Sequence, residues 1–161
     1  MIVPYGVAGK PETRLRVEFQ GNVTVAGALR VAPTAPGLFT YPGNKRLVAV
    51  NQDGTFNAAD NRAAVDSVVA AFATGEGETD PAGVDGQIAA TVFPKPLAAV
   101  EVIVGGVRAE IVYVGAAPGV VAGLLQVNFR VPRLVAPGPA VPVILRIGNA
   151  VSQDGVFMAV R

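Results

Sequence analysis

Short runs of alternating apolar and polar residues, separated by glycine and proline, extend along the whole chain. The clearest run is 14–20, where Leu15, Val17 and Phe19 share one face and charged or amide side chains occupy the other. A period of two residues is typical of a β-strand with one buried and one solvent-facing side. The run therefore predicts a strand whose apolar face packs on a core.

Further runs predict more strands, and short glycine turns connect some of them. Asp53-Gly54 and Gly105-Gly106 stand between apolar runs and are typical hairpin turns. The other predicted strands are 25–31, 46–51, one starting at Thr55, 100–104, 108–114, 124–131, 141–147 and 155–160. Their spacing predicts an all-β fold arranged as an antiparallel sandwich or barrel.

The alanine-rich segment 58–72 fits two structures. Asp60 or Asn61 has the side chain of a helix N-cap, which favours a helix after it. The run 67–73 is also apolar enough for a buried strand. We expect a short helical turn near 62–65, followed by a strand.

Two parts of the chain repeat one another. The order of matching residues is kept over some thirty positions, which favours duplication over a chance match between common residues. The matches are Val3-Pro4 with Val131-Pro132, Gly9 with Gly138, Leu15-Arg16-Val17 with Leu145-Arg146-Ile147, Gly21-Asn22 with Gly148-Asn149, and Val31 with Val160. Residues 1–38 are then expected to hold the trailing strands of an upstream repeat and a linker, and 39–161 to form one complete repeat.

The composition excludes several classes of function. The 161 residues include 13 Lys and Arg against 12 Asp and Glu, and no His, Cys or Trp. Without His or Cys the chain has no Ser-His-Asp or Cys-His catalytic set and no ordinary zinc or iron–sulfur ligands. The balanced charge gives no support for nucleic-acid binding. No apolar stretch reaches the roughly 18 residues that span a membrane, so we expect no membrane insertion.

The strongest candidates for a bound ion are the carboxylates of a glycine-rich loop. Glu76, Glu78, Asp80 and Asp85 lie close together in sequence, and Ca²⁺ takes six to eight oxygen ligands. Their spacing does not match an EF-hand, and the segment also has the composition of a solvated loop between strands. We therefore treat them as weak metal candidates and expect no cofactor.

Two further sets of residues invite a functional interpretation. Glu101 and Glu110 could serve as the carboxylate pair of a glycosidase if a hairpin brought them into one cleft. Tyr5, Tyr41 and Tyr113 could stack on a sugar, although 6% aromatic residues supply little for a carbohydrate-binding face. We expect the two glutamates to face solvent beside a turn, and we expect no enzyme activity.

An ordered series of motifs resembles a known family. The motifs are Ala35-Pro36-Gly37-Leu38-Phe39-Thr40, Asn51-Gln52-Asp53-Gly54, Ala73-Thr74-Gly75-Glu76-Gly77, Val84-Asp85-Gly86, Val104-Gly105-Gly106-Val107-Arg108-Ala109, Tyr113-Val114-Gly115-Ala116-Ala117-Pro118-Gly119, Gln126-Val127-Asn128-Phe129-Arg130-Val131-Pro132 and Ser152-Gln153-Asp154-Gly155-Val156. Over nearly its whole length the chain resembles the uncharacterised C-terminal domain family first named from Solibacter, found at the ends of large exported bacterial proteins. One departure is Glu76, where relatives usually have a small or apolar residue between the glycines.

The resemblance implies a fold, a location and a class of function. Repeats of this family are similar to immunoglobulin-like sandwiches of the IPT/TIG type, and no catalytic residues are known for it. We therefore expect a non-catalytic structural, adhesive or assembly module of a secreted or cell-surface bacterial protein. Its partners would be other domains of that protein or other copies of itself, joined through strand edges. The alternative is a carbohydrate- or calcium-dependent binding module attached to a secreted enzyme.

Overall fold

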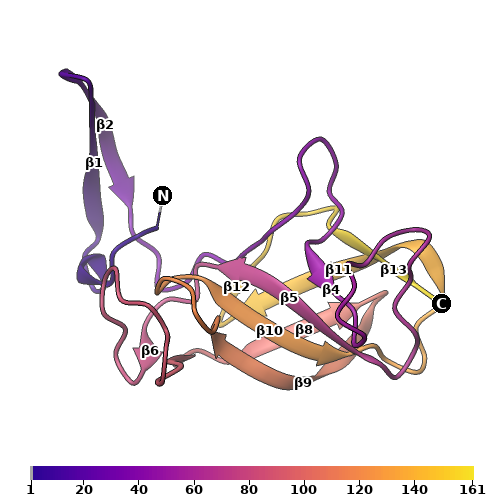
Figure 1. Ribbon diagram of the computed structural model, residues 1–161. Coiled ribbons are helices and arrows are strands. Elements are labelled where there is room, and N and C mark those ends of the chain that lie inside the picture. Colours follow the sequence, from indigo (N-terminus) through magenta and orange to yellow (C-terminus); the bar gives the residue numbers. More distant parts are fainter. Residues whose placement is uncertain (1) are drawn as a thin grey trace.

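The computed structural model describes residues 2–161 and confirms the all-β prediction (Figure 1). Apart from one short 3₁₀ turn, the regular elements of these residues are strands. The elements are η1 (Tyr5–Val7), β1 (Glu12–Phe19), β2 (Asn22–Arg30), β3 (Gly37–Leu38), β4 (Ala49–Val50), β5 (Val68–Thr74), β6 (Thr79–Asp80), β7 (Lys95–Pro96), β8 (Val100–Val104), β9 (Val107–Ala116), β10 (Leu125–Arg130), β11 (Gly138–Ile147), β12 (Ala150–Val151) and β13 (Phe157–Val160).

The body of the molecule is an antiparallel β-sandwich in which β9 belongs to both layers. The first residues of β9 pair with β8, and the rest pair with β10. One layer has the order β12-β11-β8-β9, with β13 also beside β11, and the other contains β9, β10 and β5, with β3 and β4 along β5. Strand β9 is long enough to continue from one layer into the next, which closes one side of the sandwich.

The alternating pattern of the sequence correctly locates the core of this body. In β10, Leu125, Val127 and Phe129 are each 1% exposed, whereas the polar residues between them are only partly covered. Strand β11 alternates in the same way and buries Leu145 and Ile147 completely. These side chains belong to one apolar cluster that fills the space between the layers. Burial of this apolar surface is the main favourable term in the stability of the sandwich.

Two predictions in the middle of the chain are wrong. No helical turn forms at 62–65, because this segment runs beside the last strand: Ala63 bridges Val160 in parallel, and the Val65 N–H bonds to the Arg161 carbonyl at 2.9 Å. Pairing with a distant strand overrides the local capping signal. The Asp53-Gly54 turn is present, but Phe56 makes only an isolated bridge to Val50 in place of the strand expected from Thr55.

Candidate interaction surface

Strands β1 and β2 form a hairpin that projects from the sandwich (Figure 1). Gln20 and Gly21 make the two-residue turn, and both have positive φ (50° and 77°), as a hairpin turn that matches strand twist requires. Among residues 2–161, β1 pairs with β2 alone, and no third strand joins them. An isolated two-stranded hairpin is at best marginally stable in water, so this element lacks the support that the other long strands have.

The hairpin exposes the face that the sequence predicts to be buried. Residues directly opposite in the ladder share a face, which places Leu29, the partner of Thr13, beside the alternating residues of β1. On this face Val17 is 50%, Phe19 69% and Leu29 42% exposed. The prediction that Leu15, Val17 and Phe19 share one face of a strand is therefore confirmed. The prediction that this face is buried is wrong, because no second layer covers it among the described residues.

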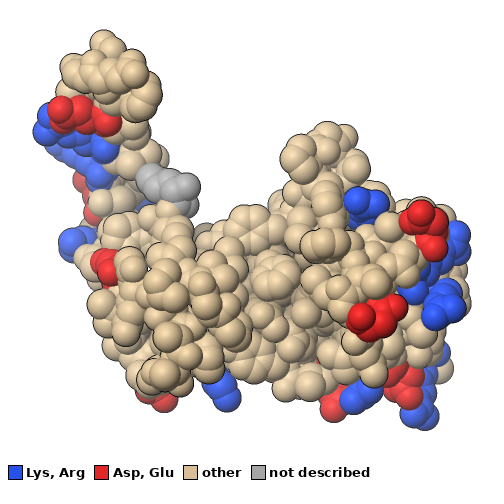
Figure 2. Space-filling model, in the orientation of Figure 1, with Lys and Arg blue, Asp and Glu red and all other residues tan. Residues whose placement is uncertain are grey.

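The other face of the hairpin is mixed in character. Arg16 and Glu18 lie two residues apart on it and form an exposed ion pair at 3.0 Å. Val23 and Val25 stand opposite these charged residues and are themselves about half exposed, at 48% and 59%. In Figure 2 the charged atoms of the projection gather below an uncharged tip. We call the face formed by Leu15, Val17, Phe19 and Leu29 the apolar face of the hairpin.

The linker and the N-terminal turn attach the hairpin to the sandwich. The Tyr5 N–H donates to an Asp85 carboxylate oxygen at 2.7 Å, and the Tyr5 hydroxyl donates to Glu76 Oε1 at 3.0 Å. In the linker, Thr34 Oγ1 donates to the Ile147 carbonyl at 2.8 Å, and the Ala35 N–H donates to the Gly75 carbonyl at 2.9 Å. These contacts hold the base of the hairpin against the sandwich, whereas strands β1 and β2 extend away from it.

Glu76 has a structural role in this attachment. It is only 6% exposed, whereas Glu78, Asp80 and Asp85 of the same loop are exposed. Within residues 2–161 there is no group of three or more side chains that could hold a metal ion, so the four weak calcium candidates are not brought into one cluster. Glu76, which stands between two glycines, is thus the residue whose carboxylate accepts the hydrogen bond of the Tyr5 hydroxyl.

The Tyr5 hydroxyl predicts a specific loss of stability at high pH. Burial, the charge of Glu76 and the hydrogen bond to it raise the pKa of Tyr5 from 10.0 to about 12. Between these values the folded state binds the proton more tightly than the unfolded state, so the contribution to stability is complete below pH 10 and lost as the pH rises toward 12. The free energy of unfolding, measured with urea between pH 10 and about 12, should fall less steeply with pH for Tyr5→Phe than for the wild type. Equal slopes would contradict the assignment.

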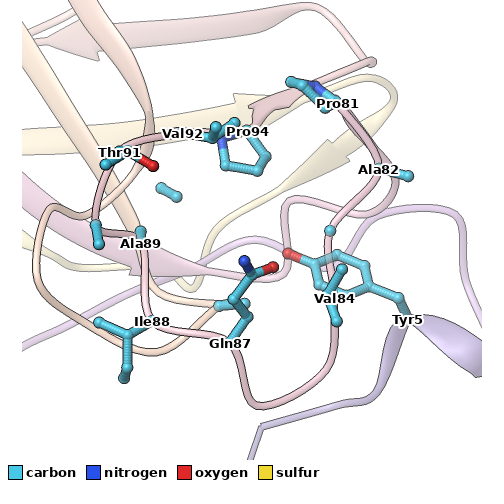
Figure 3. Close-up of a pocket in the computed structure, with 14 residues that line it drawn as sticks. Tyr5, Pro81, Ala82, Val84, Gln87, Ile88, Ala89, Thr91, Val92 and Pro94 are labelled. Carbon is cyan, nitrogen blue, oxygen red and sulfur yellow. The ribbon is translucent and has the colours of Figure 1, made fainter.

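A cavity of about 240 Å³ lies between the Tyr5 ring and the loop 81–94 (Figure 3). Its lining is mostly small and apolar, and Gln87 provides a polar side chain, while no carboxylate lines it. The cavity could not be predicted from the sequence, because 81–94 has no strand alternation and the proximity of Tyr5 depends on tertiary contacts. Tyr5 brings the N-terminal turn to its edge.

The two glutamates of the glycosidase hypothesis are both engaged in ion pairs. Glu101 pairs with Arg108 and Arg146 at 3.2 and 3.3 Å, and Glu110 pairs with Arg130 at 2.9 Å. Each of these glutamates is therefore part of an ion pair between neighbouring strands.

Each of the three tyrosines has a polar or charged partner within the protein. The Tyr5 hydroxyl donates to Glu76, and the Tyr113 hydroxyl donates to the Ala116 carbonyl at 2.8 Å. Tyr41 lies under the guanidinium of Arg46, whose central carbon is 4.2 Å from the ring centroid.

Comparisons with protein families, curated proteins and solved structures find no match to this chain. Among residues 2–161 no helix has the length and apolar character needed to cross a membrane. The most distinctive feature of the described structure is the projecting hairpin with its exposed apolar face.

Proposed function

We propose that this protein is a non-catalytic assembly module of an exported bacterial surface protein, and that the β1–β2 hairpin is its docking element. The observation that supports this most directly is the exposure of Val17 and Phe19 on an alternating strand. Contiguous apolar residues on a soluble protein mark interaction sites, and strand edges pair readily with other strands. The immunoglobulin-like character and the export belong to the proposal through the family resemblance.

The distribution of polar groups agrees with this function. Glu101 and Glu110, the carboxylates considered for catalysis, form ion pairs between strands, and Glu76, one of the metal candidates, accepts a hydrogen bond from Tyr5. The hairpin, in contrast, offers both main-chain edges and side chains to a partner. In the proposed organisation, residues 1–38 are the trailing strands of a preceding repeat with its linker, and residues 39–161 are a complete repeat.

The proposed docking surface predicts self-association of the full chain through the apolar face. Phe19→Lys places a charge at the turn end of this face and should weaken association by about tenfold, the effect expected from removal of one aromatic anchor. Light scattering over a range of protein concentrations measures the solution mass of both proteins.

A matched control separates docking from general solubility. Val25→Lys adds the same charge to the same hairpin at a position that is 59% exposed on the opposite face. It should leave the association close to that of the wild type. A wild-type chain that stays monomeric at all concentrations, or equal weakening by the two substitutions, would sink the proposed function.

A further inference from the structure

The two halves of the sequence repeat share a local structure that residue matching alone does not show. Val3-Pro4 is followed by a turn in which the Val7 N–H donates to the Pro4 carbonyl at 3.3 Å. Val131-Pro132 is followed by the same turn, with the Val135 N–H donating to the Pro132 carbonyl at 3.2 Å. Both segments thus follow the pattern Val-Pro-x-x-Val and reverse direction in the same way before a long strand begins.

The strands after these turns also correspond. Strand β1 is followed by a two-residue turn and β2, and β11 by a two-residue turn and β12. In each half the chain returns to the beginning of the long strand: the Val31 N–H donates to the Pro11 carbonyl at 3.1 Å, and Val160 lies opposite Gly138. The hairpin β1–β2 therefore has the topology of β11 with β12 and β13.

The second half shows what the first half lacks. Strand β11 pairs with β8 along one edge, with Leu145 opposite Val102 and Ile147 opposite Val100. Across this edge Arg146 forms an ion pair with Glu101 at 3.3 Å. The opposite layer covers the inner face of β11, so that Leu145 and Ile147 are 0% exposed.

The corresponding residues of β1 keep the apolar alternation without a partner strand. Counted back from the two-residue turns, Val17 and Phe19 take the places of Leu145 and Ile147, yet Val17 is 50% and Phe19 69% exposed. In the view of Figure 1, β1 lies on the side of the hairpin away from the sandwich, which leaves its outer edge accessible. Glu18 takes the place of Arg146, and its ion pair among the described residues is with Arg16 of its own strand.

We propose that the partner of the hairpin is the leading part of another β-sandwich repeat, bound as β8 binds β11. This inference rests on the proposed function and names its partner. The partner contributes an antiparallel strand with alternating apolar residues along the outer edge of β1, where Glu18 has the position that Arg146 has beside β8. A second layer from the same repeat covers Leu15, Val17 and Phe19. The hairpin is then the last part of a sandwich rather than an isolated arm.

A tandem chain tests this partner directly. Residues 39–130 are joined ahead of residues 3–161, so that Val3-Pro4 takes the place of Val131-Pro132 and the hairpin follows a copy of the leading strands. Amide exchange within residues 12–19 should slow by at least about tenfold relative to the original chain. Exchange in β11 provides the internal reference for an intact C-terminal sandwich. Unchanged exchange in 12–19 beside a protected β11 would overturn the proposal.

The charges along the shared edge give a second readout. In the tandem chain Glu18 lies opposite Glu101 of the added copy, in the position that Arg146 has in the sandwich. Glu101→Arg in the added copy replaces a like-charged pair with an oppositely charged one, so exchange within 12–19 should slow further. Equal or faster exchange in this variant would contradict the register.

A third measurement does not depend on the folding of the tandem chain. A synthetic peptide of residues 97–116, which contains β8 and β9, is added to the full chain, and the NMR signals of Val17 and Phe19 are followed. They should shift with this peptide, and at a lower concentration with its Glu101→Lys form, which places a cation opposite Glu18. If the peptide causes no NMR shift and the tandem chain shows no slower exchange in 12–19, the proposed partner is wrong. If only the self-association of the full chain is absent, the proposed docking function is wrong and the partner is not.

Discussion

Replacing Asn57 with alanine is expected to lower the free energy of unfolding by about 3 kcal/mol, because three hydrogen bonds of one fully buried side chain are lost together. Asn57 is 0% exposed. Its Nδ2 donates to the Asn51 side chain at 3.0 Å and to the Ala159 carbonyl at 2.8 Å, and its Oδ1 accepts the Ala159 N–H at 2.8 Å. These bonds hold the loop after β4 against β13, so alanine leaves buried polar groups on both segments without partners.

Aspartate at the same position separates hydrogen bonding from side-chain volume. Asn57→Asp keeps the shape and the acceptor for the Ala159 N–H, but it places an oxygen against two acceptors, Asn51 Oδ1 and the Ala159 carbonyl. At neutral pH it should therefore be at least as destabilising as Asn57→Ala, since a buried charge without a partner is costly. Urea unfolding measures both variants. The exposed Asn149→Ala should change stability by less than about 0.5 kcal/mol, and an aspartate variant as stable as wild type would contradict this account.

The core could be predicted from the sequence wherever alternation coincided with two covering layers. The period of β10 and the Gly105-Gly106 turn between β8 and β9 were both correct, because local pattern and tertiary packing agree there. The helical turn at 62–65 was wrong because a strand almost one hundred residues away supplies the hydrogen bonds of that segment. Local propensity has no information on such a partner.

At the candidate site, too, the local pattern could be predicted from the sequence and the tertiary contacts could not. The pattern of β1 identified the side chains that share a face, but whether a second layer covers that face depends on which strands are present. The role of Glu76 was also missed, because its hydrogen-bond donor, Tyr5, lies 71 residues away in sequence. A signal was nevertheless present in the sequence, because Glu76 is a charged residue directly between two glycines.

Gly75→Ala is expected to cost about 3 kcal/mol and to loosen the linker that carries the hairpin. Gly75 has φ +80°, which is unfavourable for any residue with a Cβ, and an added Cβ would overlap the Ala35 carbonyl oxygen. The linker would have to move, and the bond from the Ala35 N–H to the Gly75 carbonyl at 2.9 Å would be strained or broken. Urea unfolding measures the loss of stability, and amide exchange at Ala35 should become faster.

Gly54→Ala isolates the part of this cost that comes from the backbone angle alone. Gly54 has φ +84°, almost the same as Gly75, but an added Cβ there meets nothing within 4 Å. It should cost only about 1 kcal/mol and leave exchange at Ala35 unchanged. The difference between the two variants then measures the steric fit between the linker and the Gly75-Glu76-Gly77 loop. Equal losses would mean that this contact does not hold the linker, and the base of the hairpin would depend on the hydrogen bonds of Tyr5 and Thr34 instead.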